Sequence, residues 1–213
     1  MNASKQLILQ LFNERVRNQP IIITGPQHFG AIGHWLEDRM NISHNALNAP
    51  DIHGYEMKKH SQKISFGDFS ASEYAFTKRE RKQYTSIEFD MTRKDFLQYF
   101  GHPNPLKEGR YSWSGRCVPR YGHWNDFGQM LTIESNQDIC ARYSFEHDVR
   151  EVKHTFPAYL KTDGNVVIAI WKREKMEKHI NAKFNVNGFF ICNMTNNMFS
   201  SVSFGGCFTP LDI

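Results

Sequence analysis

The sequence predicts an α/β or α+β fold in which a mixed central β-sheet is flanked by helices, and three observations lead to this. Segments with apolar residues at helical spacing interleave along the chain with segments that alternate or run continuously apolar. Aromatic residues make up 14% of the 213 residues, which favours a packed core over disorder. No repeat or low-complexity linker divides the sequence, so we expect a single domain over residues 1–213, with room for two lobes at about 1–100 and 101–213.

The N-terminal half is expected to alternate helices with short strands. The 3.6-residue period of apolar residues defines two amphipathic helices, and Thr92 (N-cap), Asp95 (N3) and Gly101 (stop) delimit a third. The expected elements are helices at residues 5–17, 31–41 and 92–100, and strands at 54–60 and 63–69.

The C-terminal half is expected to supply most of the sheet. A Ser-Asn-Gln-Asp turn separates two alternating segments, and the continuous apolar run Val166–Trp171 is typical of a buried central strand. The expected elements are strands at residues 129–133, 139–145, 166–171 and 188–192, and helices at about 148–160 and 173–183.

Composition excludes several classes of protein. The four cysteines are scattered without a C-x-x-C pair, which argues against a zinc site or a disulfide framework. The sequence shows neither a signal peptide nor an apolar run of membrane length, so we expect a reduced, cytoplasmic protein without a membrane partner. A net charge of +4 suits a polyanionic partner without specifying one.

Two acidic residues and a lysine are close together in the sequence, with an expected bend of the chain between the first acid and the other two residues. Asp51 follows a proline, Gly54 allows the bend, and Glu56 and Lys58 come next. On the expected strand, the two-residue period places Glu56 and Lys58 on the same face. Two carboxylates suit a hard divalent cation, and a nearby ammonium group suits the water that such a cation activates for phosphodiester hydrolysis. An acid-x-Lys pair is also common on solvated strand faces, so this pattern alone leaves both interpretations open.

The segment upstream favours the catalytic interpretation. Residues 30–38, Gly-Ala-Ile-Gly-His-Trp-Leu-Glu-Asp, start an amphipathic helix that carries a further acid, Glu37. A Gly-x-x-Gly-x-x-Leu-Glu helix, a loop ending in Ala-Pro-Asp and a Gly-x-Glu-x-Lys strand form a composite signal. This signal is more specific than any of its parts.

The composite run, residues 30–60, resembles the core of the MvaI/BcnI type II restriction endonucleases and of the related mismatch-repair nickase MutH. These proteins belong to the PD-(D/E)xK nuclease superfamily, and Asn-Ala-Pro-Asp-Ile-His-Gly-Tyr-Glu-Met-Lys-Lys-His is especially similar to the MvaI version. The resemblance implies a restriction-endonuclease-like core in which Asp51 and Glu56 are metal ligands and Lys58 is the catalytic lysine. It also implies that Glu37 lies next to the metal site.

The same resemblance implies a Mg²⁺-dependent type II restriction endonuclease that cuts double-stranded DNA at a short specific site. Such an enzyme works as a monomer beside a cognate DNA methyltransferase, with a catalytic lobe at about 1–100 and a DNA-recognition lobe at about 101–213. A MutH-like strand-nicking endonuclease and a DNA-binding module without activity are the alternatives. The family's later segment rich in Asp, His, Gly and Arg is not recognisable after Phe189, so either other loops read DNA or this is a shortened member.

Two basic segments are candidates for contacting DNA. The first is aromatic and basic, and it suits guanine edges, phosphates and base reading, although its tryptophans could instead fold back onto the body. The second suits phosphate contacts, although such runs are usually solvated faces. The candidates are Arg110, Arg116, Arg120, His123 and Asn125 in the first segment, and Lys78, Arg79, Arg81 and Lys82 in the second. The mixed charges of residues 172–178 fit an ordinary exposed helix better than a DNA contact.

Overall fold

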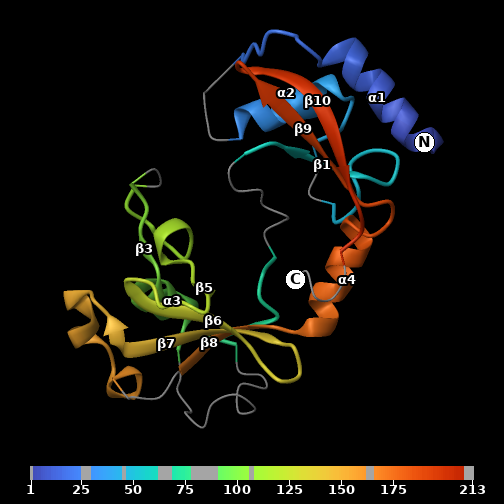
Figure 1. Cartoon of the computed structure of the whole chain (residues 1–213). Helices are drawn as coiled ribbons and strands as arrows, with labels where there is room; N and C mark the ends of the chain where they lie inside the picture. Colours follow the sequence, from blue (N-terminus) through green and yellow to red (C-terminus); the bar gives the residue numbers. More distant parts are fainter. Residues whose placement is uncertain are drawn as a thin grey trace. The chain divides into compact units, whose positions relative to one another are not determined.

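The chain forms two compact units, drawn in Figure 1. The computed structural model describes residues 2–24, 30–44, 47–61, 69–77, 91–105, 108–161 and 166–208. Unit 1 comprises Met1–Asp68 and Glu177–Ile213, and unit 2 comprises Phe69–Met176 (Figure 1). Unit 2 is therefore an insertion in the sequence of unit 1, whereas the sequence suggested lobes divided near residue 100. No helix among the described residues is long and apolar enough to cross a membrane.

Unit 1 contains a three-stranded mixed sheet and two helices that precede it in the sequence. Strand β1 (Glu56–Lys59) pairs in parallel with β9 (Phe189–Thr195), which pairs antiparallel with β10 (Met198–Gly205). Helices α1 (Ala3–Arg15) and α2 (Ala31–Arg39) lie beside this sheet (Figure 1).

One face of the unit 1 sheet carries its apolar core. Phe12 of α1 and Leu36 of α2 are buried in one cluster with Met57 of β1 and Phe190 of β9. Because side chains alternate along a strand, the neighbours of Met57 in β1 turn to the opposite face. The core thus fixes which face of β1 is left for polar groups.

Unit 2 is built on a five-stranded mixed sheet. Its strand order is β2-β8-β7-β6-β5, from β2 (Glu73–Tyr74), β8 (Val166–Trp171), β7 (Ile139–Asp148), β6 (Phe127–Ile133) and β5 (Arg120–Tyr121). Helix α3 (Arg93–Phe100) packs Phe96 and Phe100 against this sheet, and β3 (His102–Pro103) pairs with β4 (Tyr111–Ser112). Helix α4 (Arg173–Lys183) follows β8 in the sequence, and its last seven residues belong to unit 1.

Most of the expected elements are confirmed, within the α/β class with mixed sheets. The strand expected at 54–60, the helix α4 and the capping box between Thr92 and Asp95 at the start of α3 are present. The helix expected at 148–160 is wrong. Its residues form two short 3-10 helices, η4 (Glu151–Thr155) and η5 (Ala158–Leu160), because Pro157 forces the residue before it out of helical geometry.

Two further elements differ from expectation in another way. Strand β10 was not expected from the sequence, and it forms a hairpin with β9 through Asn196 and Asn197, which both have positive φ. The strand expected at 63–69 lies almost entirely outside the described residues.

Candidate active site

A tight turn between Asp51 and Glu56 brings the two acidic residues close together. Ile52 and Tyr55 exchange backbone hydrogen bonds of 3.0 and 2.8 Å, which closes a two-residue loop. Its central residues, His53 and Gly54, have φ values of 48° and 78°, as type I′ turns require. The chain therefore reverses direction just before strand β1 begins.

The turn is held in place by a residue far away in the sequence. The Asn187 side chain donates a 2.9 Å hydrogen bond to the His53 carbonyl, and its backbone N–H donates one of 3.0 Å to the Gly54 carbonyl. Gly54 has a φ of 78°, which L side chains rarely adopt, and a Cβ atom there would come within 2.4 Å of Asn187 Nδ2, so a substitution would be strained. Asn187 lies just before β9, so the turn and the strand beside β1 are fixed together.

The expected triad is brought together at the start of β1. Asp51 Oδ2 accepts a 2.8 Å hydrogen bond from the Met57 backbone N–H, which ties the first acid to the strand. Lys58 Nζ donates a 2.7 Å hydrogen bond to Glu56 Oε1, so these two side chains share one face as the alternation predicted.

Glu56 is unusual in being a nearly buried carboxylate. Its side chain is 3% exposed, and its Oε2 atom has no hydrogen-bond partner among the described residues. Burial raises the pKa of the Glu56 carboxyl, and the Asp51 charge also raises it, while Lys58 and Lys183 act in the opposite direction. A buried carboxylate oxygen without a donor is suited to binding a cation.

Helix α4 adds a second lysine that the sequence reasoning missed. Lys183 Nζ lies 3.3 Å from Glu56 Oε1, the same oxygen that Lys58 contacts. The Lys58 ammonium also lies 5.5 Å from the centre of the Phe184 ring. The sequence around Lys183 has no motif that singles it out, and only its position as the last residue of the basic helix could have drawn attention to it.

The same helix also holds the loop that leads to Asp51. Asn48 Nδ2 lies 3.0 Å from His179 Nδ1 and donates a 3.2 Å hydrogen bond to the His179 carbonyl. His179 and Lys183 are four residues apart and therefore share one side of α4. The C-terminal part of α4 thus contacts Glu56 through Lys183 and the loop before Asp51 through His179.

The donor set fits a hard divalent cation. Two carboxylates, one of them with an orphaned buried oxygen, are the ligand type that Mg²⁺ prefers. No group of three His, Cys, Asp or Glu side chains in the described part of the chain is arranged to hold a metal ion. Asp51 and Glu56 are the two carboxylates that would hold such a cation.

The structure gives Glu37 a different set of neighbours. His44 Nε2 lies 3.3 Å from Glu37 Oε2 and 3.2 Å from Asp38 Oδ1. Helix α2 packs against the face of β1 that carries Met57, and Glu56 points to the other face. The contact that the structure gives Glu37 is thus with His44, and its expected role beside the metal stays a prediction.

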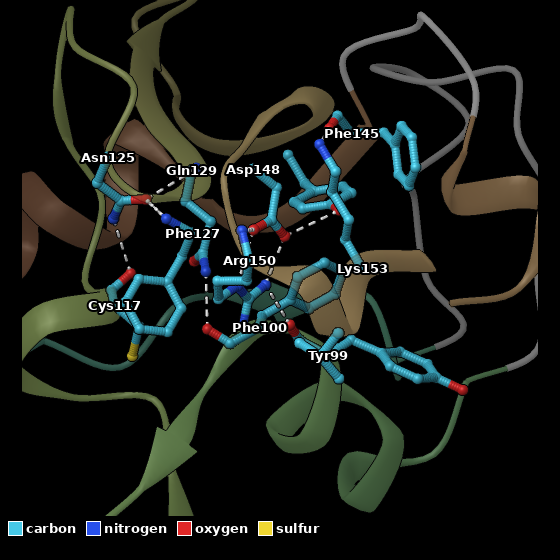
Figure 2. A network of polar contacts seen from close by, with 12 residues as sticks. Tyr99, Phe100, Cys117, Asn125, Phe127, Gln129, Phe145, Asp148, Arg150 and Lys153 are labelled. Atoms are coloured by element: carbon cyan, nitrogen blue, oxygen red, sulfur yellow. Dashed lines mark hydrogen bonds and ion pairs between the residues drawn. The ribbon is translucent and has the colours of Figure 1, made fainter. Parts of the chain in front are cut away.

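The DNA-contact candidates in unit 2 fall into two groups. Arg110, Arg116, Arg120 and His123 are exposed on the connections around β4, η3 (Gly115–Cys117) and β5. Asn125 instead uses its amide inside the loop. It donates to the Cys117 carbonyl and accepts from the Phe127 and Gln129 N–H groups (Figure 2). It also donates to the Val118 carbonyl, so its side chain organises the loop.

The tryptophans of this segment pack onto unit 2. Trp113 donates a 2.6 Å hydrogen bond to Gln129 Oε1 and stacks near Trp171, and Trp124 stacks on His147. Packed tryptophans and exposed arginines therefore occur in the same segment. The candidates Lys78, Arg79, Arg81 and Lys82 lie outside the described residues.

A buried ion pair lies beside the Asn125 loop in unit 2, as Figure 2 shows. Arg150 donates to both oxygens of the fully buried Asp148 at 2.8 and 2.6 Å, and to the Tyr99 carbonyl at 2.8 Å. Its guanidinium carbon lies 4.5 Å from the centre of the Phe127 ring. Because every one of these groups is engaged, we interpret this network as structural.

A mixed α/β fold, with paired acids and a lysine at the start of one strand, is the arrangement that the sequence led us to expect for a type II restriction endonuclease. A family model described as the LlaMI restriction endonuclease matches residues 22–212, and the chain belongs to this family. The resemblance inferred from the composite run is thereby confirmed.

Two individual proteins are similar to the chain. The type II restriction enzyme ScrFI of Lactococcus lactis subsp. cremoris is 37% identical over 211 residues, which cover 90% of this chain and 76% of ScrFI. The solved complex of restriction endonuclease MvaI with its cognate DNA substrate is similar with a TM-score of 0.52 and 14% identity, over 95% of this chain and 74% of that one. At that identity, the second similarity shows a shared fold.

Proposed function

We propose that this restriction endonuclease is a Mg²⁺-dependent enzyme that hydrolyses phosphodiester bonds of double-stranded DNA at a short specific site in the cytoplasm. The observation that carries the proposal is the meeting of Asp51, Glu56 and Lys58 at the start of β1. The similarity to MvaI, which was solved with its cognate DNA, supports duplex DNA as the substrate. A cognate methyltransferase that protects the host's own sites completes the proposed system.

Each residue of the triad has a distinct role in this mechanism. Asp51 and Glu56 would hold Mg²⁺, and Glu56 would offer its unpartnered Oε2. When bound, the cation lowers the pKa of a water molecule and stabilises negative charge on the reacting phosphate. Lys58 leaves Glu56 Oε1 to donate to the attacking water or to a phosphate oxygen, where its positive charge stabilises the transition state.

The face of the sheet around the triad suits a polar ligand. Pairing between β1 and β9 places Lys58 beside Ile191, and β9 continues on that face to Asn193. Asn193 donates to the hydroxyl of Ser203, an exposed residue of β10. These uncharged polar groups suit a DNA backbone that approaches the site, because they donate hydrogen bonds to phosphate oxygens.

We propose that unit 2 supplies the recognition of the DNA sequence. Its exposed Arg110, Arg116, Arg120 and His123 have the donor groups that read guanine edges and phosphates. Lys78, Arg79, Arg81 and Lys82 belong to the same unit in sequence and suit phosphate contacts. Phosphate contacts set affinity and register, and contacts to base edges set the specific site.

Plasmid cleavage tests the proposal. We expect discrete fragments with Mg²⁺, and binding without cutting when Ca²⁺ replaces it. Asp51→Asn and Glu56→Gln keep the size of each side chain but remove a charged ligand, so each should lower cleavage by several orders of magnitude while DNA binding in a gel-shift assay survives. Retention of a tenth of the wild-type rate by either variant would contradict the metal-site assignment.

The same assay separates the alternatives. Nicked circles as the final product would indicate a strand-nicking enzyme, because linear DNA requires both strands to be cut. A shifted band without any cleavage in Mg²⁺ would indicate a binding module. Either result would replace the proposal.

A further inference from the structure

We propose that Lys183 is a second active-site lysine, a positioning residue that holds the Glu56 carboxylate while Lys58 moves to the reacting phosphate. The inference rests on the proposed nuclease function and adds a residue that the composite motif does not contain. Lys183 ends α4, and its ammonium group lies 3.3 Å from Glu56 Oε1.

The first step of the argument is that two ammonium groups share one oxygen. Glu56 Oε1 has Lys58 at 2.7 Å and Lys183 at 3.3 Å, whereas Glu56 Oε2 has no hydrogen-bond donor among the described residues. Both lysines therefore pull the carboxylate from the same side. This arrangement fixes the carboxylate so that Oε2 is left for a cation.

The second step concerns what happens when Lys58 serves the substrate. Lys58 cannot donate to a phosphate group and keep the whole of its contact with Glu56. Glu56 is 3% exposed, so water replaces a lost partner poorly, and an unpaired buried carboxylate is costly. Lys183 keeps its ion pair with Glu56, so the carboxylate keeps its orientation when Lys58 moves.

The third step is that the helix that carries Lys183 is itself anchored beside the acidic turn. The same side of α4 carries His179, whose carbonyl and ring nitrogen contact Asn48 in the loop that leads to Asp51. The side chain of Lys183 is 22% exposed, less than an ordinary surface lysine. An anchored helix and a mostly buried side chain therefore keep the ammonium group close to Glu56.

Charge balance provides a test that an ordinary structural role would fail. Asp51, Glu56, Lys58 and Lys183 are formally neutral together, and each ammonium group repels an incoming divalent cation. Removing Lys183 leaves a net negative site. Metal affinity should therefore rise while catalysis falls, because the carboxylate is less well positioned in the transition state.

The experiment compares Lys183→Ala, Lys183→Arg and the control Lys178→Ala, which changes an exposed lysine of the same helix. Calorimetric titration of the DNA-free protein with Ca²⁺ reports metal affinity, and single-turnover cleavage at saturating Mg²⁺ reports the chemical step. For Lys183→Ala we expect a several-fold lower Kd for Ca²⁺ and at least a tenfold slower cleavage. Lys183→Arg should recover most of the rate, and Lys178→Ala should match the wild type in both measurements.

Other outcomes overturn the inference. Wild-type cleavage by Lys183→Ala would show that the second lysine is dispensable, and weaker Ca²⁺ binding together with slow cleavage would show a merely structural role. In both cases the nuclease function stands if Glu56→Gln abolishes cutting. Unchanged cleavage by Glu56→Gln would instead reject the proposed site, and the role of Lys183 with it.

Discussion

At the scale of single residues, the alternation of side chains along β1 separates two adjacent lysines. Lys58 lies on the Glu56 face, and Lys59 lies on the face of Met57. We expect Lys58→Ala to abolish cleavage and Lys59→Ala to leave it nearly unchanged, as measured by single-turnover cleavage of a plasmid. Equal losses from both variants would contradict the assignment of β1.

Glu56 also makes stability depend on pH in a specific direction. Its raised pKa means that the folded, metal-free protein binds this proton more tightly than the unfolded chain does. The protonated Glu56 carboxyl therefore contributes to the free energy of unfolding. This contribution is complete below the pKa that Glu56 has in the unfolded chain, and it is lost as the pH rises through the higher pKa of the folded protein.

Glu56→Gln provides the reference for this effect, because its amide does not ionise. We expect the free energy of unfolding of the wild type to fall relative to that of Glu56→Gln as the pH rises through this window. Urea denaturation in the presence of a chelator, repeated over a pH series, measures the difference. A constant difference between the two proteins at all pH values would show that burial does not disfavour the Glu56 charge.

At the scale of elements, the turn before β1 depends on one glycine. Gly54 has a φ of 78° and faces Asn187, so Gly54→Ala should lower the free energy of unfolding by more than about 1 kcal/mol and slow cleavage. Gly33→Ala is the matched control. Gly33 lies inside α2, and beyond its chain neighbours and its own helix backbone nothing lies within 4 Å of an added Cβ, so alanine should stabilise the helix by about 0.5–1 kcal/mol. Thermal and urea unfolding distinguish the two, and a harmless Gly54→Ala would mean that the turn tolerates a side chain.

The Asp148–Arg150 ion pair gives a prediction for unit 2. Arg150→Met leaves the fully buried Asp148 carboxylate without its main partner, which should cost about 3–5 kcal/mol in unfolding free energy. The double variant with Asp148→Asn should lose less than Arg150→Met alone, since no buried charge remains. Urea denaturation measures both. A larger loss in the double variant would mean that the ion pair is not the source of the effect.

At the scale of the whole molecule, one chain carries one site of the Asp51–Glu56–Lys58 type among its described residues. A monomer with one site cuts one strand at a time and must release or reorient before the second cut. We therefore predict a monomer of 24.9 kDa in light scattering and a transient rise of nicked circular plasmid during digestion. A dimer mass together with direct conversion of supercoiled to linear DNA would contradict this, because a symmetric dimer presents two sites at once.

The sequence by itself determined what depends on near neighbours in the chain. The Thr92–Asp95 capping box, the α4 segment and the common face of Glu56 and Lys58 follow from spacings of two to four residues, which backbone geometry sets locally. Strand β10 was within reach as well, because Ser-Val-Ser-Phe at residues 201–204 alternates with a two-residue period. The expected helix at 148–160 failed at Pro157, a signal that was also local.

Only the tertiary structure decided which distant residues meet. The insertion of unit 2 separates β1 from β9 and α4 in the sequence, yet parallel pairing and the end of α4 bring Asn187 and Lys183 to the turn and to Glu56. Two contacts over shorter separations, Glu37 with His44 and the Asn125 amide with its own loop, likewise required the folded path of the chain. Local periodicity contains no information about such contacts, because they depend on the path of the chain between the elements and on the burial that the folded core imposes.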